Sequence, residues 1–133
     1  MKCLLVDDSR TMRNIQKKVL GSMPGLEFAE AGDGIEALSV ISATPSGFDF
    51  MIVDWNMPNM DGITLIKKVR ETDKKTLLIM ATTEAEKSRV LDAIRAGVNN
   101  YVVKPFTPIS LMEKVTATLA KAKAAAAATP AAA

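Results

Sequence analysis

Three aspartates stand directly after two short apolar runs of the sequence. Asp7 and Asp8 follow the run Cys3 to Val6, and Asp54 follows the run Met51 to Val53. If these runs are neighbouring strands, the three carboxylates meet at one edge of a sheet. Like charges held that close raise one another's pKa and oppose folding unless a cation joins them. Oxygen ligands with room for water suit Mg²⁺ better than zinc or copper, so the pattern predicts a magnesium site.

A lysine and a pair of threonines end two further apolar runs. Lys104 follows Tyr101 to Val103, and its ammonium group could pair with a carboxylate or a phosphoryl oxygen at the same edge. Thr82 and Thr83 follow Leu77 to Ala81, and a hydroxyl group there can donate to a bound anion. These positions favour an anion site beside the expected metal.

Each of these residues also has an ordinary structural explanation. Asp7 and Asp8 could be N-cap residues of a helix that begins near Thr11. Asp54 could be a turn aspartate, Lys104 a solvated surface charge, and the threonine pair a helix cap. A turn or a cap needs only one aspartate, so three aspartates at two strand ends favour the joint site.

Strand-length apolar runs alternate with helical patterns through the whole chain. The expected strands are Cys3 to Val6, Leu26 to Ala29, Met51 to Val53, Leu77 to Ala81 and Tyr101 to Val103. Apolar residues recur at helical spacing in Met12 to Val19, Ile35 to Ile41, Ile63 to Val69, Val90 to Ile94 and Ile109 to Leu119. Strands that are apolar on both faces suit a parallel sheet covered by helices on both sides. The prediction is an α/β fold with a doubly wound five-stranded parallel sheet and five helices, whose ligands bind beyond the carboxyl ends of the strands.

The loop from Met57 to Gly62 separates one expected strand from the next expected helix. Pro58 disfavours helix before it, and Gly62 is expected to supply a permissive turn position ahead of the helix. This loop follows Asp54 closely, so we expect it to border the acidic site.

Composition limits the possible classes of function. The chain has 133 residues, 48% of them hydrophobic and 24% charged, which fits one globular domain. It contains no histidine, which excludes Ser/His/Asp triads, His-ligated zinc and a phosphohistidine carrier. The net charge is +2, and basic and acidic residues are equal in number without Lys121 and Lys123, so no basic surface for binding nucleic acid is expected.

No apolar run is long enough to span a membrane and no signal peptide is recognisable, which predicts a cytoplasmic protein. The single cysteine, Cys3, is expected to be a small buried hydrophobe.

Four motifs in this order resemble the receiver domain of two-component response regulators. They are Leu5-Val6-Asp7-Asp8-Ser9, Asp54-Trp55-Asn56-Met57-Pro58-Asn59-Met60-Asp61-Gly62, Ala81-Thr82-Thr83-Glu84 and Tyr101-Val102-Val103-Lys104-Pro105-Phe106. The second motif is most similar to the CheY-like receivers of bacterial chemotaxis. The resemblance covers residues 1–120, the predicted receiver domain, and implies a flavodoxin-like, CheY-like three-layer sandwich. Residues 121–133 are expected to form an alanine-rich flexible C-terminal tail.

The resemblance implies a metal and acceptor role for four of the residues. Asp54 would be the phosphoacceptor. Asp8 and Asp54, with the main-chain carbonyl group of Asn56, would bind Mg²⁺, and Asp7 would reach the metal through water. In phosphoryl transfer the protein mainly positions groups and neutralises charge, which this set of residues can do.

The resemblance also implies a switch that connects the acceptor to the surface. Lys104 would pair with the phosphoryl oxygens, and Thr82 would hydrogen-bond one of them. The added negative charge would draw Thr82 inward, and the space that it leaves would let Tyr101 turn from solvent to interior. Pro105 would follow a cis peptide bond.

Two further groups of residues have expected roles in hydrolysis and output. Asn56, Thr83 and Glu84 would lie near the path of the attacking water, and substituting Asn56 or Glu84 is expected to change the hydrolysis rate more than the metal affinity. Four residues could form an output face or could equally be solvated helix residues: Lys87, Val90, Tyr101 and Lys114.

The resemblance implies a single-domain response regulator of a two-component system that acts in chemotaxis. It would accept its phosphoryl group from a CheA-like histidine kinase, catalyse that transfer and its own dephosphorylation, and then bind an effector such as a flagellar motor switch protein. We expect a monomer without nucleic-acid or membrane partners. Alternatives are a phosphate sink without a motor target and a receiver cut from a longer response regulator. A Mg²⁺-dependent phosphatase would instead carry an Asp-x-Asp pair on its first strand, and a scaffold would not need this set of residues.

Overall fold

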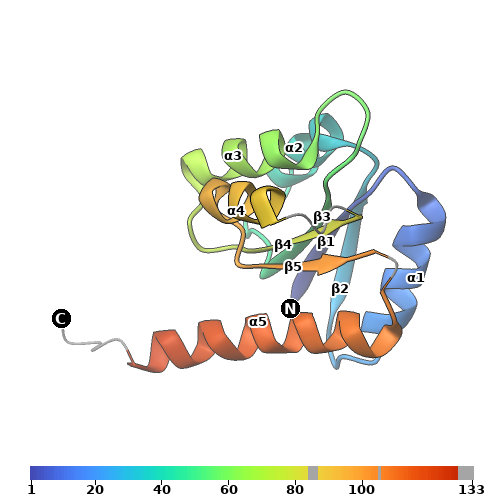
Figure 1. Ribbon diagram of the computed structural model, residues 1–133. Coiled ribbons are helices and arrows are strands. Elements are labelled where there is room, and N and C mark those ends of the chain that lie inside the picture. The colour runs from blue at the N-terminus through green and yellow to red at the C-terminus, as the bar shows by residue number, and fades with distance from the viewer. Residues whose placement is uncertain (84–86, 105, 129–133) are drawn as a thin grey trace.

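A single parallel sheet, covered by helices on both faces, forms the described part of the protein (Figure 1). The computed structural model describes residues 1–83, 87–104 and 106–128. Its strands are β1 (Lys2–Val6), β2 (Glu27–Ala31), β3 (Phe50–Asp54), β4 (Leu77–Thr82) and β5 (Asn100–Val103). Its helices are α1 (Arg10–Leu20), α2 (Gly34–Ser42), α3 (Gly62–Thr72), α4 (Lys87–Ala96) and α5 (Pro108–Ala128). The predicted doubly wound α/β fold with five strands and five helices is confirmed within these ranges.

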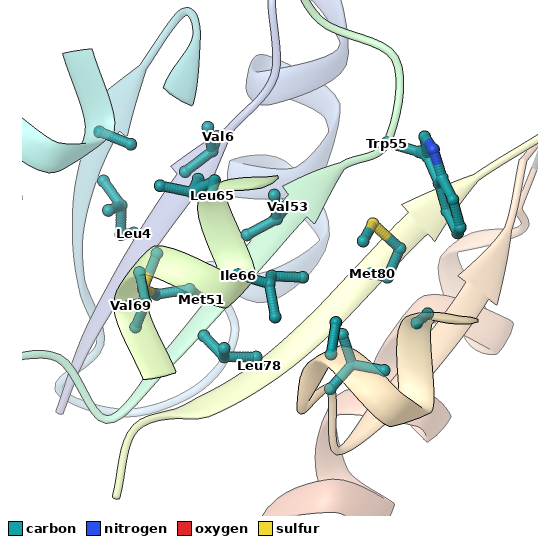
Figure 2. Packing of buried hydrophobic residues seen from close by; sticks show 14 of the residues in the cluster. Leu4, Val6, Met51, Val53, Trp55, Leu65, Ile66, Val69, Leu78 and Met80 are labelled. Carbon is teal, nitrogen blue, oxygen red and sulfur yellow. The ribbon is translucent and has the colours of Figure 1, made fainter. Parts of the chain in front are cut away.

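Alternating residues of the strands supply two separate hydrophobic cores. On one face of the sheet, Leu4, Met51 and Leu78 pack with buried residues of α2, α3 and α4. Figure 2 shows part of this core, in which Leu65, Ile66 and Val69 of α3 lie against the strands. On the other face, the neighbouring strand residues pack with Leu20 of α1 and with Leu111 and Val115 of α5. Burial on both faces explains why the central strands are apolar runs without polar alternation.

The order of the strands places the acidic residues side by side. The sheet runs β2-β1-β3-β4-β5, so the winding reverses between β1 and β3. Val6 on β1 is in register with Val53 on β3, and the residues that follow them are Asp7 and Asp54. The register alone therefore brings two carboxylates from distant parts of the chain to the same edge.

The ends of several elements differ by a few residues from the sequence prediction. β2 begins at Glu27, not at Leu26, and continues to Ala31, because it pairs with the whole length of β1 from Lys2 to Val6. Asp54 and Thr82 are the last residues of their strands. α5 is helical to Ala128, and residues 129–133 lie outside the described part of the chain, so the flexible tail stays a prediction.

Two other predictions concern burial and membrane contact. Cys3 is fully buried and free of any disulfide, which confirms the prediction of a small buried hydrophobe, and burial raises the pKa of its thiol. Among the described helices, none combines the length and the apolar character that crossing a membrane requires.

The loop between β3 and α3 needs a glycine for a reason other than the predicted one. The positive φ of this loop, 67°, belongs to Asn59, so the permissive turn position predicted for Gly62 is wrong. Gly62 is the first residue of α3, and a Cβ atom there would lie 2.2 Å from the carbonyl oxygen of Asp54. Gly62 also donates its N–H to the carbonyl of Trp55 at 2.8 Å. The absence of a side chain lets α3 begin against the end of β3.

We expect Gly62→Ala to lower the free energy of unfolding by about 3 kcal/mol, because the added methyl group must displace the main chain of Asp54. Urea denaturation followed by circular dichroism measures the loss. Gly25→Ala is a control, since Gly25 has a φ of 71° but open space around it, and its strain alone should cost about 1 kcal/mol. Equal losses in the two variants would contradict the steric explanation.

Candidate functional site

Three carboxylates meet at the carboxyl edge of the sheet. One oxygen each from Asp7, Asp8 and Asp54 lies within 4.8 Å of the others. Asp7 and Asp54 are buried, with 1% and 8% of their surface exposed, whereas Asp8 is exposed to solvent. The convergence expected from the sequence is therefore present, with a buried side and an open side.

Lys104 lies against the buried side of this cluster. Its Nζ atom is 2.8 Å from Oδ2 of Asp7 and 3.2 Å from Oδ1 of Asp54, and its side chain is 12% exposed. The main-chain N–H of Lys104 donates to the carbonyl of Thr82 at 2.7 Å, which continues the pairing of β5 with β4 beyond the last strand residue. Lys104 is thus held in place at the site, and the solvated surface charge that was its alternative explanation is wrong.

The environment of the site shifts two of its pKa values. Burial raises the pKa of Asp54, and the charge and hydrogen bond of Lys104 only partly offset this effect, while Asp7 and Asp8 add to it. Burial alone would lower the pKa of Lys104, but its hydrogen bond to Asp7 and the charges of Asp54 and Asp7 outweigh burial and raise the pKa. The ammonium form of Lys104 is therefore stabilised, whereas ionised Asp54 is destabilised.

A serine, not an aspartate, caps the helix that follows β1. The N-cap residue of α1 is Ser9, whose hydroxyl oxygen accepts from the N–H of Met12 at 3.1 Å. Asp7 accepts from the N–H of Ser9 at 2.9 Å through Oδ1, which fixes the short loop instead of the helix end. The alternative explanation of Asp7 and Asp8 as N-cap residues is therefore wrong, and the carboxylate of Asp8 remains available at the open side.

The loop after Asp54 is anchored at several points. Trp55 is buried, with 5% of its surface exposed, and Asn56 follows it at the exposed start of the loop. Further along, Nδ2 of Asn59 donates to Oδ2 of Asp33, the N-cap residue of α2, at 2.9 Å. The loop that carries Asn56 is therefore tied to α2 as well as to α3.

Thr82 and Tyr101 lie on the two strands beyond Asp54. Thr82 ends β4 and is 2% exposed, and its neighbour Ala81 is in register with Asp54. Tyr101 on β5 is half-buried, and Nζ of Lys114 on α5 lies 5.3 Å from the centre of its ring. Thr82 is thus at the site edge, and Tyr101 stands between the core and the outer face.

Some residues of the predicted water path and output face lie outside the part of the chain that the structure describes. Glu84 and Pro105 lie outside the described residues, as does the side chain of Lys87. Thr83 is exposed directly after β4, and Val90 on α4 is half-buried. Of the four predicted output residues, Tyr101 and Lys114 are brought into contact.

Sequence reasoning missed Arg13 as a neighbour of the site. Its guanidinium group donates to the main-chain carbonyl of Asp7 and, at 3.0 Å, to the carboxylate of Glu30 on β2. In the sequence Arg13 is one of several basic residues of an amphipathic helix. Its position six residues after Asp7, one turn into α1, was the available signal.

The chemistry of these donors fits Mg²⁺. The cluster offers carboxylate oxygens only, and a magnesium ion prefers oxygen ligands together with several waters. The exposure of Asp8 leaves one side open for such waters. Three negative charges facing one ammonium group also leave an excess of negative charge that a divalent cation would balance.

Comparison with known proteins supports one family. The family profile of the response regulator receiver domain matches residues 3–116. The chemotaxis protein CheY1 of Helicobacter pylori is 48% identical over 117 residues, which cover 86% of this chain and 94% of that protein.

Solved structures give the same result. The crystal structure of the CheX-CheY-BeF₃-Mg²⁺ complex from Borrelia burgdorferi includes a chain that matches with a TM-score of 0.84 and 28% identity, over 90% of this chain and 89% of that one. A putative two-component system response regulator/GGDEF domain protein matches with a TM-score of 0.84 and 28% identity over 92% of this chain. This chain spans 50% of the length of that longer protein.

The raised pKa of Asp54 predicts a pH-dependent stability. Since the pKa in the folded state lies above the ordinary value of 3.8, protonation of Asp54 favours folding, and stability is lost as the pH rises through the raised pKa. At pH 7 without divalent metal, Asp54→Asn should therefore raise the free energy of unfolding by an amount on the order of 1 kcal/mol. The gain should disappear as the pH falls toward the ordinary carboxyl value.

Urea denaturation in the presence of a chelator, repeated from neutral to acidic pH, measures this difference. Asp92→Asn, which neutralises an exposed carboxylate on α4, should leave stability nearly unchanged at every pH. An Asp54→Asn variant that is less stable than the native protein at pH 7 would contradict the raised pKa of Asp54.

Proposed function

Because the chain belongs to the response regulator receiver family and is similar to its chemotaxis branch, we propose that it is a phosphorylation switch whose acceptor is Asp54. The observation that carries this proposal is the buried carboxylate of Asp54, 3.2 Å from the ammonium group of Lys104 and beside two further carboxylates. A structural ion pair would need one carboxylate, whereas this site concentrates three.

The reaction is transfer of a phosphoryl group from a histidine kinase to Asp54. The nitrogen–phosphorus bond of the kinase phosphohistidine breaks, a phosphorus–oxygen bond to the Asp54 carboxylate forms, and the released imidazole takes up a proton. Asp8 and Asp54, with the carbonyl of Asn56, would hold Mg²⁺, and Asp7 would reach it through water. When bound, Mg²⁺ neutralises charge on the phosphoryl oxygens.

Lys104 stabilises the phosphorylated form directly. Its Nζ atom already lies between Asp7 and Asp54, so it can turn to a phosphoryl oxygen on Asp54 with little movement. The raised pKa keeps it charged over the physiological range. A fixed cation that meets the developing negative charge costs no reorganisation during the transfer.

The switch then runs from the acceptor to the outer face. The phosphoryl group adds negative charge and acceptor oxygens, which draw the hydroxyl group of Thr82 toward Asp54. Thr82 is buried at the end of β4, and half-buried Tyr101 lies on the neighbouring strand β5, paired with Met80 two residues before Thr82. The movement of Thr82 would free space for the Tyr101 ring and break its contact with Lys114. Such a repacking changes the surface that a partner reads.

The proposed partners follow from the chemotaxis branch of the family. A CheA-like histidine kinase supplies the phosphoryl group, and an effector protein such as a flagellar motor switch protein binds the phosphorylated form. In this proposal the receiver domain comprises residues 1–120 and acts as a monomer in the cytoplasm. It also catalyses its own dephosphorylation. A phosphate sink and a receiver that is part of a longer response regulator are the alternatives, and the matched response regulator/GGDEF protein is an example of the longer kind.

Incubation with a small phosphodonor and Mg²⁺ should add one phosphoryl group to the protein, detected by intact mass spectrometry. Asp54→Asn should show no adduct, because the acceptor oxygen is replaced, while Asp92→Asn should react like the native protein. An adduct that persists in Asp54→Asn, or its absence in the native protein, would sink the proposal.

Binding assays separate a motor effector from a phosphate sink. The native protein, with and without an acyl-phosphate mimic, is tested against a purified flagellar motor switch protein from the same source. Binding only with the mimic supports the effector role. No binding in either state, together with rapid phosphoryl acceptance from the kinase, supports the sink.

A further inference from the structure

The guanidinium group of Arg13 connects β2 to the loop that holds the carboxylates. It donates through Nη1 to the main-chain carbonyl of Asp7 and through Nε to Oε1 of Glu30, at 3.0 Å. The side chain is 15% exposed, so little water competes for these contacts. A planar fork with donors in fixed directions suits such a bridge, and a lysine cannot reproduce it.

With Arg13 in place, each main-chain and side-chain polar group of Asp7 has a hydrogen-bond partner. Its N–H donates to the carbonyl of Ala31 at 3.1 Å, its Oδ1 accepts from Ser9 at 2.9 Å, and its Oδ2 accepts from Lys104 at 2.8 Å. Arg13 provides the partner of the remaining polar group, the main-chain carbonyl. That carbonyl belongs to the peptide unit that leads into Asp8, so its hydrogen bond fixes the orientation of the next residue.

Glu30 holds the fork from the other side. It lies on β2, in register with Leu5 of β1, and accepts from Lys17 at 3.0 Å as well as from Arg13. The hydrogen bond from Lys17 and the contacts with Arg13 lower the pKa of Glu30. Lys17 binds the same carboxylate but, within the described residues, forms no hydrogen bond with the loop after β1, which makes it a matched comparison.

We propose that Arg13 is a positioning residue for metal binding, in which its fork between Glu30 and the Asp7 carbonyl orients the Asp8 carboxylate toward the ion. This inference rests on the proposed Mg²⁺ site. Hydrogen-bond partners behind metal ligands set ligand direction and typically change metal affinity tenfold or more when removed. The hydrogen bonds of Arg13 go to the Asp7 carbonyl and to Glu30, so the role that we assign to it is geometric.

If Arg13 acted only through its charge, its removal would change the Mg²⁺ affinity in the opposite direction. Arg13 carries a positive charge close to a cation site, so removing that charge should strengthen Mg²⁺ binding if charge alone matters. If the fork positions Asp8, removing it should weaken binding even though repulsion is relieved. Arg13→Lys adds a second distinction, because it keeps the charge and loses the fork.

The test is isothermal titration of Mg²⁺ into the native protein and into three variants, Arg13→Gln, Arg13→Lys and Lys17→Gln. We expect the dissociation constant to rise about tenfold in Arg13→Gln and by a smaller factor in Arg13→Lys. Lys17→Gln removes a charge from the same network without touching Asp7, so it should stay within about twofold of the native value. Thermal melting checks that each variant is folded, and Arg13→Lys decides the matter if Arg13→Gln does not fold.

Hydrogen exchange without metal gives an independent readout. The N–H groups of Asp7 and Ser9 should exchange faster in both Arg13 variants than in Lys17→Gln, because the loop loses its tie to β2. Unchanged exchange together with unchanged or tighter Mg²⁺ binding in the Arg13 variants overturns the inference, as does an equal loss in Lys17→Gln. If the native protein itself binds no Mg²⁺, the proposed metal site fails, and the inference fails with it.

Discussion

The fold has to accommodate concentrated negative charge at the carboxyl edge of its sheet, and the ammonium group of Lys104 is what makes this possible. Nζ of Lys104 reaches Asp7 and Asp54 together, at 2.8 and 3.2 Å. Since Asp8 adds a third carboxylate within the same cluster, the balance remains negative. A site in this condition attracts a divalent cation, and the proposed phosphoryl transfer to Asp54 would need such a cation to neutralise the phosphoryl charge.

The rest of the structure keeps those side chains in place. The two cores hold β1, β3 and β4 in register, so that Asp7 and Asp54 end neighbouring strands. Gly62 allows α3 to begin against the carbonyl of Asp54, and Ser9 rather than either aspartate completes the start of α1. Arg13 and Glu30 tie the loop after β1 to β2. Hydrophobic packing thus sets the position of the strands, and a small number of polar contacts sets the direction of the carboxylates.

Regular elements were predictable because their signals are local. The apolar runs around Leu4 and Ile52 mark strands buried on both faces, and the spacing of Ile63, Ile66 and Val69 marks a helix with one buried face. Ends were less predictable, as at β2, where pairing with β1 decides the last residue. The role of Gly62 was mistaken because a turn and a close approach of two main chains both favour glycine, and sequence alone does not distinguish them.

The sequence by itself determined the fold class, the family resemblance and the candidate residues of the site. These candidates could be named because each follows or ends an apolar run: Asp7, Asp8, Asp54, Thr82 and Lys104. Only the tertiary structure decided that Lys104 is shared by Asp7 and Asp54, that Asp8 is the open carboxylate, and that Arg13 reaches the Asp7 carbonyl. The physical reason is the range of the interactions. The periodicity of a helix and the approximate end of a strand depend on residues that are close together in the sequence. Hydrogen bonds between residues as far apart as Asp7 and Lys104 form only after the strands have paired.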